Sequence, residues 1–499
     1  MTKDQGVDRR TVLLGSVGAM TSLALASCGI GPAPFSREIG PRSAEVRAAE
    51  KLRRRPGQRL VTQKIVAQPT TVDLGTQSVE TWAYGEGIPG PLIRTTAGDL
   101  LRVELTNQLP TDTSVHWHGV AMSNDMDGVP GVTQRPIGAG STFTYEFTTP
   151  DPGTYFFHPH TGVQLDRGLY GVLVVDDPHE EGKYDQEWIV VLDDWIDGTG
   201  QTPDDVLDDL TSMAGMGHGG MGDGGMMDME RFRSPYLGGA GDVDYPLYLV
   251  NGRVPESPDT LRGKPGQRAR IRIINAGSDT AFRVALGGHR MTVTHSDGFP
   301  LKPVTTDALM IGMGERYDVT VELRDGVFPL VAAAEGKSGT GLAVVRTGAG
   351  AVPVPDAAPP ELSRRVLMGT DLMAADDVRL ESRRPARRLD VVAAGGMMPY
   401  RWTINGKRFP NHEPLVIEPG ERARLRFRNT SRMFHPMHLH GHTFGLVAGG
   451  ARKDTVIVPP KQTIDVDVEA DNPGQWALHC HNIYHAEAGM MTVLSYRTS

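Results

Sequence analysis

The stretch PGERARLRFRN at residues 419–429 occurs in related form at two earlier places, as AGDLLRVELTN at residues 97–107 and as PGQRARIRIIN at residues 265–275. Each copy places a glycine turn before an alternating strand that ends in asparagine. The copies lie about 155 to 170 residues apart, which is close to the length of an ordinary domain. The repetition therefore predicts three copies of one β-sandwich rather than a short-period repeat array.

The chain around these copies has the same character. Short runs rich in valine, isoleucine, leucine and threonine alternate with glycine, proline, asparagine and aspartate turns, which is typical of an all-β sandwich or barrel. Helix is scarce, although TPDDVLDDL at residues 202–210 suggests a short one with Pro203 in its first turn. We predict an all-β chain of three Greek-key sandwiches, with domains at residues 59–178, 179–355 and 356–499.

The N-terminus has the features of an export signal. Arg9 and Arg10 precede an apolar run at residues 12–26 that is too short to span a bilayer. The paired arginines resemble a twin-arginine signal, and residues 25–28 resemble a bacterial lipobox ending in Cys28. We predict a lipoprotein signal at residues 1–28, a tether at residues 29–58, and a monomer that contacts the outer face of the cell membrane only through its lipid.

Charge and cysteine content narrow the function further. The formal net charge is -9 at pH 7, without the basic stripe that nucleic acid binding needs. The two cysteines are Cys28 and Cys480, so a lipidated Cys28 leaves Cys480 without a disulfide partner. A thiol that stays free in an oxidising compartment is protected or employed, and metal ligation does both.

A paired-histidine pattern follows the repeated strand. Nine residues after Asn107 comes HWHG, and nine residues after Asn429 comes HLHG, whereas the residues nine after Asn275 are VALG. The outer domains also share PGTYFFHPH at residues 152–160 and PGQWALHCH at residues 473–481. The first and third domains therefore carry two HxH pairs each, and the second carries none.

The HxH spacing indicates a metal site. Alternate side chains of a strand point to the same face, so both histidines of a pair face together and the central residue faces the other way. Such numbers of neutral imidazoles suit Cu, Zn, Fe or Ni. The eight histidines are His116, His118, His158, His160, His438, His440, His479 and His481.

The same alternation turns Cys480 into the core of its own sandwich. There we expect it to meet His485 and, from an earlier strand, His435. One Cys, two His and a weak axial Met form a blue-copper electron-transfer site, and Met490 and Met491 both follow the turn at Gly489. The first domain lacks this second site because Pro159 and Thr113 stand at the matching positions.

These motifs over residues 60–499 resemble the multicopper oxidases, which are three-domain, laccase-like enzymes built from cupredoxin sandwiches. The resemblance implies four coppers per chain, and its family spacing selects Met490 over Met491 as the axial ligand. The implied ligand sets are His435, Cys480, His485 and Met490 for type 1 copper; His116 and His438 for type 2; and His118, His158 and His481 with His160, His440 and His479 for the two type 3 coppers.

The resemblance implies four one-electron oxidations of a reductant coupled to reduction of one dioxygen to two waters. Oxygen reduction consumes protons, and Asp127 matches the family's acidic position near type 2 copper; an ordinary Asp-Gly turn is the other interpretation. A second acid is absent after the last type 1 histidine, where this chain has Ala486.

The reductant is suggested by a methionine-rich segment in the middle domain. Soft thioethers select Cu(I), so we predict Cu(I) recruitment there and oxidation to Cu(II) in copper detoxification. A flexible low-complexity loop is the other interpretation of the segment. Ser431 stands where copper-detoxifying relatives place an aspartate, which keeps a laccase acting on phenols or amines, or a ferrous oxidase, in contention. The predicted Cu(I) residues are Met213, Met216, His218, Met221, Met226, Met227, Met229 and Met433.

Two other classes fit less well. A copper-storage or electron-carrier protein needs only the type 1 ligands and leaves the eight histidines unexplained. A copper nitrite reductase needs only three histidines at its catalytic copper.

Overall fold

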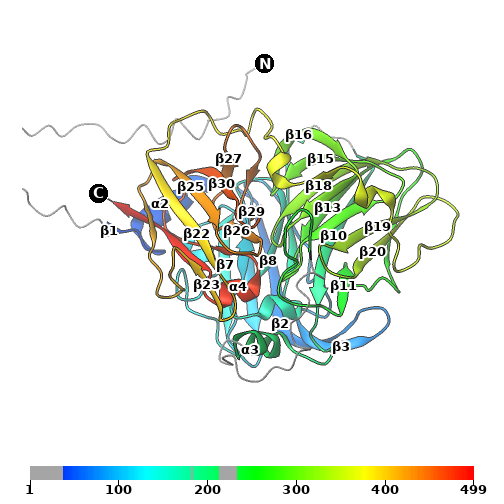
Figure 1. Ribbon diagram of the computed structural model, residues 1–499. Coiled ribbons are helices and arrows are strands. Elements are labelled where there is room, and N and C mark those ends of the chain that lie inside the picture. The colour runs from blue at the N-terminus through cyan, green and yellow to red at the C-terminus, as the bar shows by residue number, and fades with distance from the viewer. Residues whose placement is uncertain (1–36, 181–183, 213–232, 499) are drawn as a thin grey trace, which may run out of the picture. The chain divides into compact units, whose positions relative to one another are not determined.

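The computed structural model describes residues 37–180, 184–212 and 233–498, and this part of the chain forms three β-sandwiches with few helices (Figure 1). The predicted all-β fold is confirmed. The predicted signal at residues 1–28, including Cys28, and the methionine-rich segment at residues 213–229 lie outside the described residues. Within the described ranges, no helix has the length and apolarity needed to cross a bilayer.

Domain 1 pairs two four-stranded sheets, in the orders β3-β2-β5-β7 and β4-β9-β8-β6. Its core gathers Trp117, Tyr145 and Phe147, all fully buried. The strands are β2 (Leu60–Asp73), β3 (Ser78–Tyr84), β4 (Ile93–Thr96), β5 (Leu100–Asn107), β6 (His116–His118), β7 (Thr142–Thr148), β8 (Gly153–His158) and β9 (Gly171–Asp176), with 3-10 turns η1 (Asn124–Met126) and η2 (Gln164–Arg167).

Domain 2 pairs two six-stranded sheets, β11-β10-β13-β18-β15-β16 and β12-β20-β19-β14-β17-β21. The helix predicted around Pro203 is α3 (Pro203–Ser212). The strands are β10 (Gln186–Trp195), β11 (Leu247–Val250), β12 (Asp259–Arg262), β13 (Arg268–Asn275), β14 (Phe282–Leu286), β15 (Met291–Ser296), β16 (Phe299–Thr306), β17 (Ala308–Ile311), β18 (Arg316–Glu322), β19 (Val327–Ala334), β20 (Thr340–Arg346) and β21 (Val366–Leu367).

The boundary between domains 2 and 3 lies later than the sequence predicts. Strand β21 pairs in parallel with β17, so the chain still adds to a sheet of domain 2 beyond residue 355. The proline-rich composition at residues 351–363 resembles a linker, but two short 3-10 turns, η4 (Pro360–Ser363) and η5 (Gly369–Asp371), lie on either side of this edge strand.

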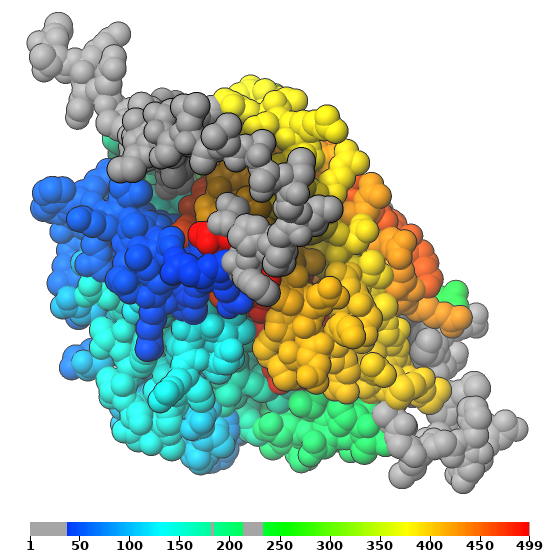
Figure 2. Space-filling view, turned by 90° about the vertical axis from the view of Figure 1, so that its left-hand side faces the viewer, coloured from blue at the N-terminus to red at the C-terminus, as the bar shows by residue number. Residues whose placement is uncertain are grey.

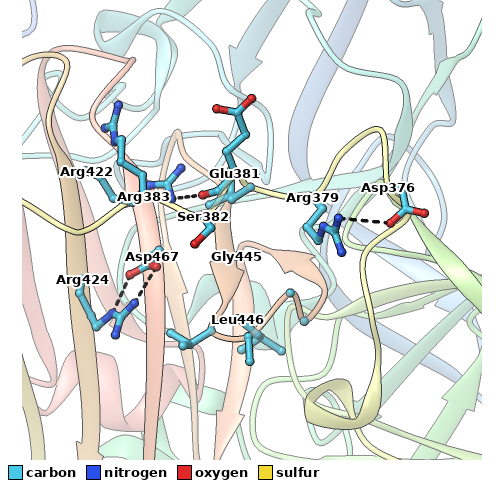
Figure 3. Close-up of a pocket in the computed structure, with 15 residues that line it drawn as sticks. Asp376, Arg379, Glu381, Ser382, Arg383, Arg422, Arg424, Gly445, Leu446 and Asp467 are labelled. Atoms are coloured by element: carbon cyan, nitrogen blue, oxygen red, sulfur yellow. Dashed lines mark hydrogen bonds and ion pairs between the residues drawn. The ribbon is translucent and has the colours of Figure 1, made fainter.

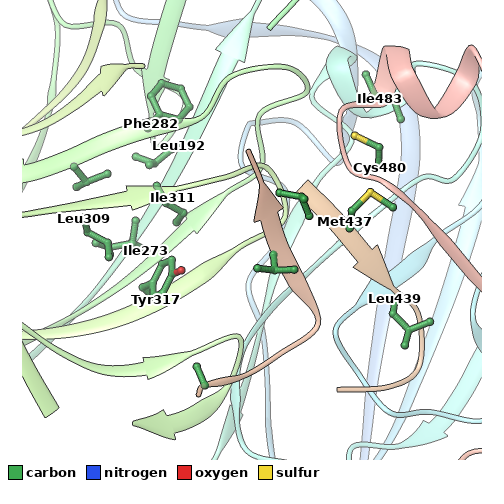
Figure 4. Close-up of a cluster of buried hydrophobic side chains, with 14 of the residues drawn as sticks. Leu192, Ile273, Phe282, Leu309, Ile311, Tyr317, Met437, Leu439, Cys480 and Ile483 are labelled. Atoms are coloured by element: carbon green, nitrogen blue, oxygen red, sulfur yellow. The ribbon is translucent and has the colours of Figure 1, made fainter. Parts of the chain in front are cut away.

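Domain 3 contains the sheet β23-β22-β25-β30-β27-β28 and the sheet β1-β32-β31-β26-β29, where β24 also pairs with β32. Cys480 lies in its core with Met437 and Ile483 (Figure 4). The elements are β22 (Arg387–Met397), β23 (Tyr400–Ile404), β24 (Leu415–Ile417), β25 (Arg422–Asn429), β26 (His435–Leu439), β27 (Phe444–Leu446), β28 (Arg452–Lys453), β29 (Thr455–Val458), β30 (Thr463–Glu469), β31 (Gln475–Cys480), α4 (Ile483–Glu487) and β32 (Met491–Thr498).

The repeated sequence forms the same strand in each domain, namely β5, β13 and β25. Its terminal asparagine fixes the turn that follows. The amide of Asn107 donates to the carbonyls of Thr111 and Ile137, both at 2.8 Å, and its side-chain oxygen accepts from the Leu109 N–H. Asn275 and Asn429 make matching contacts. Because this turn leads into the next strand, the asparagine sets where the HxH residues begin.

The segment predicted as a tether is structured from Arg37 onward. Strand β1 (Arg37–Glu38) pairs with β32, and helix α2 (Ala44–Arg53) begins at an N-cap on Ser43. Glu50 of this helix accepts from the backbone N–H of Thr148 in domain 1, and Arg53 donates to Asn472 in domain 3. Figure 2 shows this dark-blue segment between cyan domain 1 and orange domain 3. Contacts with domains 1 and 3 hold this segment in place, and the amino-acid composition of the segment does not reveal them.

Candidate metal centres

A mononuclear site forms inside domain 3 where β26, β31 and α4 meet. The Sγ atom of Cys480 lies 3.5 Å from Nδ1 of both His435 and His485, and the two Nδ1 atoms are 3.1 Å apart. All three side chains are fully buried. Asn482 caps α4 by accepting from the Tyr484 and His485 N–H groups, so the chain turns back immediately after the cysteine. The structure thus brings together the three residues predicted for type 1 copper.

The two candidate axial methionines face different ways. Met490 is fully buried in the same core cluster as Cys480, and its carbonyl accepts from the Cys480 N–H at 3.1 Å. Met491 is paired with His479 across β31 and β32 and packs with Ala477 and Val129 instead. Met490 is therefore the methionine on the Cys480 side.

The outer nitrogens of this site are held by a serine and an aspartate. Ser431 Oγ lies 2.8 Å from Nε2 of His435, and Asp242 Oδ2 lies 2.9 Å from Nε2 of His485. Burial lowers the pKa of His485, but the Asp242 carboxylate outweighs it and raises that pKa to about 10. Asp242 belongs to domain 2, and the sequence does not indicate its role because no recognisable motif surrounds it. The sequence comparison expected an acid at the position of Ser431 instead.

The eight paired histidines converge at the boundary of domains 1 and 3. In domain 1, β6 and β8 place His116 opposite His158, and in domain 3, β26 and β31 place His438 opposite His479. Between the domains, Nε2 of His116 lies 3.4 Å from Nε2 of His438. Imidazoles from two domains of the same chain therefore meet nitrogen to nitrogen.

The predicted trios also gather. Nε2 of His479 lies 3.0 Å from Nε2 of His440 and 3.3 Å from Nε2 of His160. The ring of His481 lies 4.9 Å from that of His118 and 5.2 Å from that of His158, measured between centroids. Eleven of the twelve residues predicted to bind copper thus gather in two places, three at the mononuclear site and eight histidines at the domain boundary, and Met490 lies in the core on the Cys480 side.

The imidazoles are anchored on the side away from the cluster. A ligating histidine usually gives its other ring nitrogen to a carbonyl or carboxylate, which fixes its orientation and tautomer. Four Nδ1 atoms lie within 3.0 Å of backbone carbonyls, pairing His116 with Asp127, His158 with Pro159, His438 with Asp454 and His479 with Cys480.

Burial makes the cluster suitable for a metal. It lowers the pKa of His479 to about 3 and keeps the imidazoles of His118, His158, His160, His440 and His481 neutral by lowering each pKa well below its ordinary value. Neutral imidazole is the ligand form. Among the described residues, the buried nitrogens His118 Nδ1, His158 Nε2 and both of His481 have no hydrogen-bond partner, as expected of metal ligands. The residues fit a copper cluster.

Asp127 lies behind this cluster rather than inside it. Both of its carboxylate oxygens are 3.1 Å from Nδ1 of His440, and one is 3.2 Å from Nδ1 of His116. The residue is fully buried just after η1. It orients two imidazoles directly. Glu487, the acidic residue directly after Ala486, is exposed on α4.

Sequence reasoning also missed Asp454 and Arg316. Asp454 Oδ1 lies 3.1 Å from Nε2 of His118, and Arg316 of domain 2 binds both Asp454 oxygens at 2.7 Å. Burial works to raise the pKa of Asp454, but Arg316 and His438 outweigh it, so that pKa lies well below its ordinary value. The sequence contains no signal for these two residues because Arg316, Asp454 and His118 lie in three different domains.

The surface of domain 3 has a separate pocket of about 530 Å³ (Figure 3). Its arginines are paired with acids, Arg424 with Asp467 and Arg379 with Asp376. None of the predicted metal residues that the structure describes lines it.

Family models for multicopper oxidases match residues 66–180, 187–350 and 383–499. The chain belongs to the multicopper oxidase family. It is a copper-dependent oxidoreductase that acts with dioxygen and a metal or phenolic reductant.

The chain is similar to several proteins with different names. Multicopper oxidase MmcO of Mycobacterium tuberculosis is 49% identical over 492 residues, covering 96% of this chain and 95% of that protein. A copper resistance protein A homolog of Pseudomonas syringae pv. tomato is 29% identical, covering 81% and 87%. Among solved structures, the laccase from Botrytis aclada is 25% identical with a TM-score of 0.72, covering 89% and 88%. Fet3p, at 22% identity and a TM-score of 0.75 over 88% and 90%, supports the fold alone.

Proposed function

We propose that this multicopper oxidase takes its electrons from Cu(I) and releases Cu(II), in copper detoxification. One observation carries the proposal: both flanks of the methionine-rich segment at residues 213–229 lie beside the mononuclear site. On one side, α3 packs near β23 of domain 3 (Figure 1), and the ring of Trp402 in β23 lies 4.0 Å from the ring of His485, measured between centroids. On the other, a Cβ on Gly239 would come within 3.3 Å of Met433 Sδ, and Asp242 contacts His485.

The side chains around His485 suit a soft cation that gives up one electron. Asp242 supplies a buried carboxylate whose Oδ1 has no hydrogen-bond partner among the residues that the structure describes, and Tyr400 donates to its Oδ2 at 2.8 Å. Two further thioethers lie at the hairpin between β22 and β23, Met397 beside Tyr400 and Met398 with 83% of its surface exposed. Thioethers favour Cu(I) over harder cations such as Fe(II). Relatives named copper resistance protein A agree with this chemistry.

The proposal includes four coppers in the ligand sets implied by the sequence: one type 1, one type 2 and two type 3. When bound, the coppers supply single-electron uptake at the mononuclear site and reduction of dioxygen to water at the cluster. The chain contributes a short covalent link, because Cys480 is bonded through its backbone to His479 and His481. Asp127 orients His440 and His116, and we propose that it also holds protons used in oxygen reduction.

Oxygen uptake by the copper-loaded full chain, measured side by side with Cu(I), Fe(II) and a phenol, tests the proposal. We expect the highest kcat/KM with Cu(I). Replacing the six methionines of residues 213–229 by leucine should raise the KM for Cu(I) at least about 10-fold and leave the KM for the phenol unchanged. The matched control replaces the glycines of the same segment by serine and keeps every thioether. Equal changes for Cu(I) and the phenol would remove the recruiting role, and faster turnover with Fe(II) would replace Cu(I) as the substrate.

Export and lipid attachment through Cys28 complete the proposal, because a detoxifying oxidase must meet its metal outside the cytoplasm. C28A should release the oxidase from the membrane fraction without changing its turnover. An unchanged distribution of the variant between membrane and soluble fractions would argue against the anchor.

A further inference from the structure

The middle domain lacks HxH pairs but reaches the eight-histidine cluster through one arginine. Arg316, the first residue of β18, is fully buried. Its two terminal nitrogens donate to the two oxygens of Asp454 in domain 3, both at 2.7 Å, and its Nε donates to the Thr154 carbonyl of domain 1 at 3.1 Å. One side chain of domain 2 therefore binds both domains that carry the histidines.

Asp454 links Arg316 to two histidines of the cluster. Its Oδ1 lies 3.1 Å from Nε2 of His118, and its carbonyl oxygen lies 3.0 Å from Nδ1 of His438. The two rings belong to different domains and stack with centroids 3.8 Å apart at 11°. Because the Asp454 carboxylate accepts the Nε2–H of His118, it favours the tautomer in which Nδ1 carries the free lone pair, and within the described ranges that buried Nδ1 has no hydrogen-bond partner.

Two other residues of domain 2 also lie close to Asp454 or to the histidine rings. Asp297 Oδ2 accepts from the backbone N–H groups of Asp454 and Thr455 at 3.2 and 3.3 Å. Gly314 has a φ of +82°, and a Cβ there would come within 2.8 Å of the rings of both His118 and His481. The turn before β18 thus lies directly on the cluster, with no room for a side chain.

We infer that Arg316 is a positioning residue of the copper cluster, acting through Asp454 on His118 and His438. The inference rests on the proposed copper assignment. Only the planar guanidinium can hold both carboxylate oxygens at once, which prevents the carboxylate from rotating away from His118. Domain 2, which has no HxH pair, thereby helps to position the histidines of the cluster.

The test uses the copper-loaded full chain with Arg316→Gln and Arg316→Lys, read by copper content and electron paramagnetic resonance. We expect R316Q to lose about one copper of four per chain and its type 2 signal, with at least 10-fold faster copper loss to a chelator, while the blue type 1 absorption stays. R316K keeps the charge without the fork, so it should retain copper and show a shifted type 2 spectrum. If R316Q is insoluble, the R316K spectrum decides.

The matched control is Arg272→Gln. Arg272 is equally buried in domain 2 and binds Thr154 and Asp318, but not Asp454. R272Q should keep the wild-type spectrum and copper content. Wild-type spectra in the Arg316 variants, or equal type 2 loss in R272Q, would overturn the inference. A wild-type protein without a type 2 signal would instead refute the copper assignment on which it rests.

Discussion

The contact between Asp242 and His485 predicts an unusual pH dependence of stability in the copper-free protein. A pKa of about 10 for His485, against an ordinary 6.5, corresponds to roughly 5 kcal/mol of folding free energy at most. Since the folded pKa lies above the unfolded one, this contribution is complete below pH 6.5 and is lost as the pH rises through about 10. Asp242→Asn keeps an acceptor for Nε2 and removes the charge, so it should abolish the contribution.

The assay is urea unfolding of copper-free protein at several pH values between 6 and 10.5, followed by tryptophan fluorescence. We expect the free energy of unfolding of D242N to fall below that of the wild type by several kcal/mol at pH 6, and the gap to close toward pH 10.5. Asp244→Asn, at an exposed aspartate two residues on, is the matched control and should show no such gap. A gap between D242N and the wild type that is constant over this range would refute the reasoning.

A second consequence concerns metal loading at the same site. Copper needs the free lone pair of His485, so binding at pH 8 should release about one proton more in the wild type than in D242N. A pH-stat titration measures this directly. Equal proton release would mean that His485 is already neutral before the metal arrives.

Three further predictions concern single positions. Asp127→Asn should slow oxygen uptake roughly 10–100-fold without changing the type 1 absorption, because the carboxylate orients His440 and His116; a normal rate would leave it as an ordinary turn residue. Cys480→Ser should abolish the blue absorption and Cu(I)-dependent oxygen uptake together, and uptake that persists would show another electron route. Joint replacement of Met397 and Met398 by leucine should raise the KM for Cu(I) a few-fold, about 2 to 5, and leave that for a phenol unchanged.

The sequence predicts the fold and the histidine pairs because both follow from local order along the chain. The fixed distance from Asn107 and Asn429 to the HxH residues has a structural cause: the asparagine amides bind the turn that starts the next strand. Strand alternation then separates Cys480 from His479 and His481 without further information. In the tether, by contrast, α2 is held by Thr148 and Asn472, whose contacts no local pattern encodes.

What the sequence does not reveal lies across domain boundaries. Asp242 and His485 are 243 residues apart, and His118 and Asp454 are 336 apart. Each aspartate looks like an ordinary turn or strand-end residue until the fold brings its partner. Ser431 illustrates this, because it stands where an aspartate was expected and binds His435. The carboxylate at this site comes from domain 2, where Asp242 binds His485.

The middle domain acquires a role from these contacts. Val284 and Leu286, at its HxH positions, are packed in its hydrophobic core, so the domain cannot bind copper there. Asp242 of this domain nevertheless contacts His485 at the mononuclear site, and Arg316 binds Asp454, which contacts the histidines of the cluster. Both contacts are buried and charged, and each would leave an unpaired charge if the domain shifted. Domain 2, without an HxH pair of its own, thus contacts both candidate metal centres through buried charged side chains.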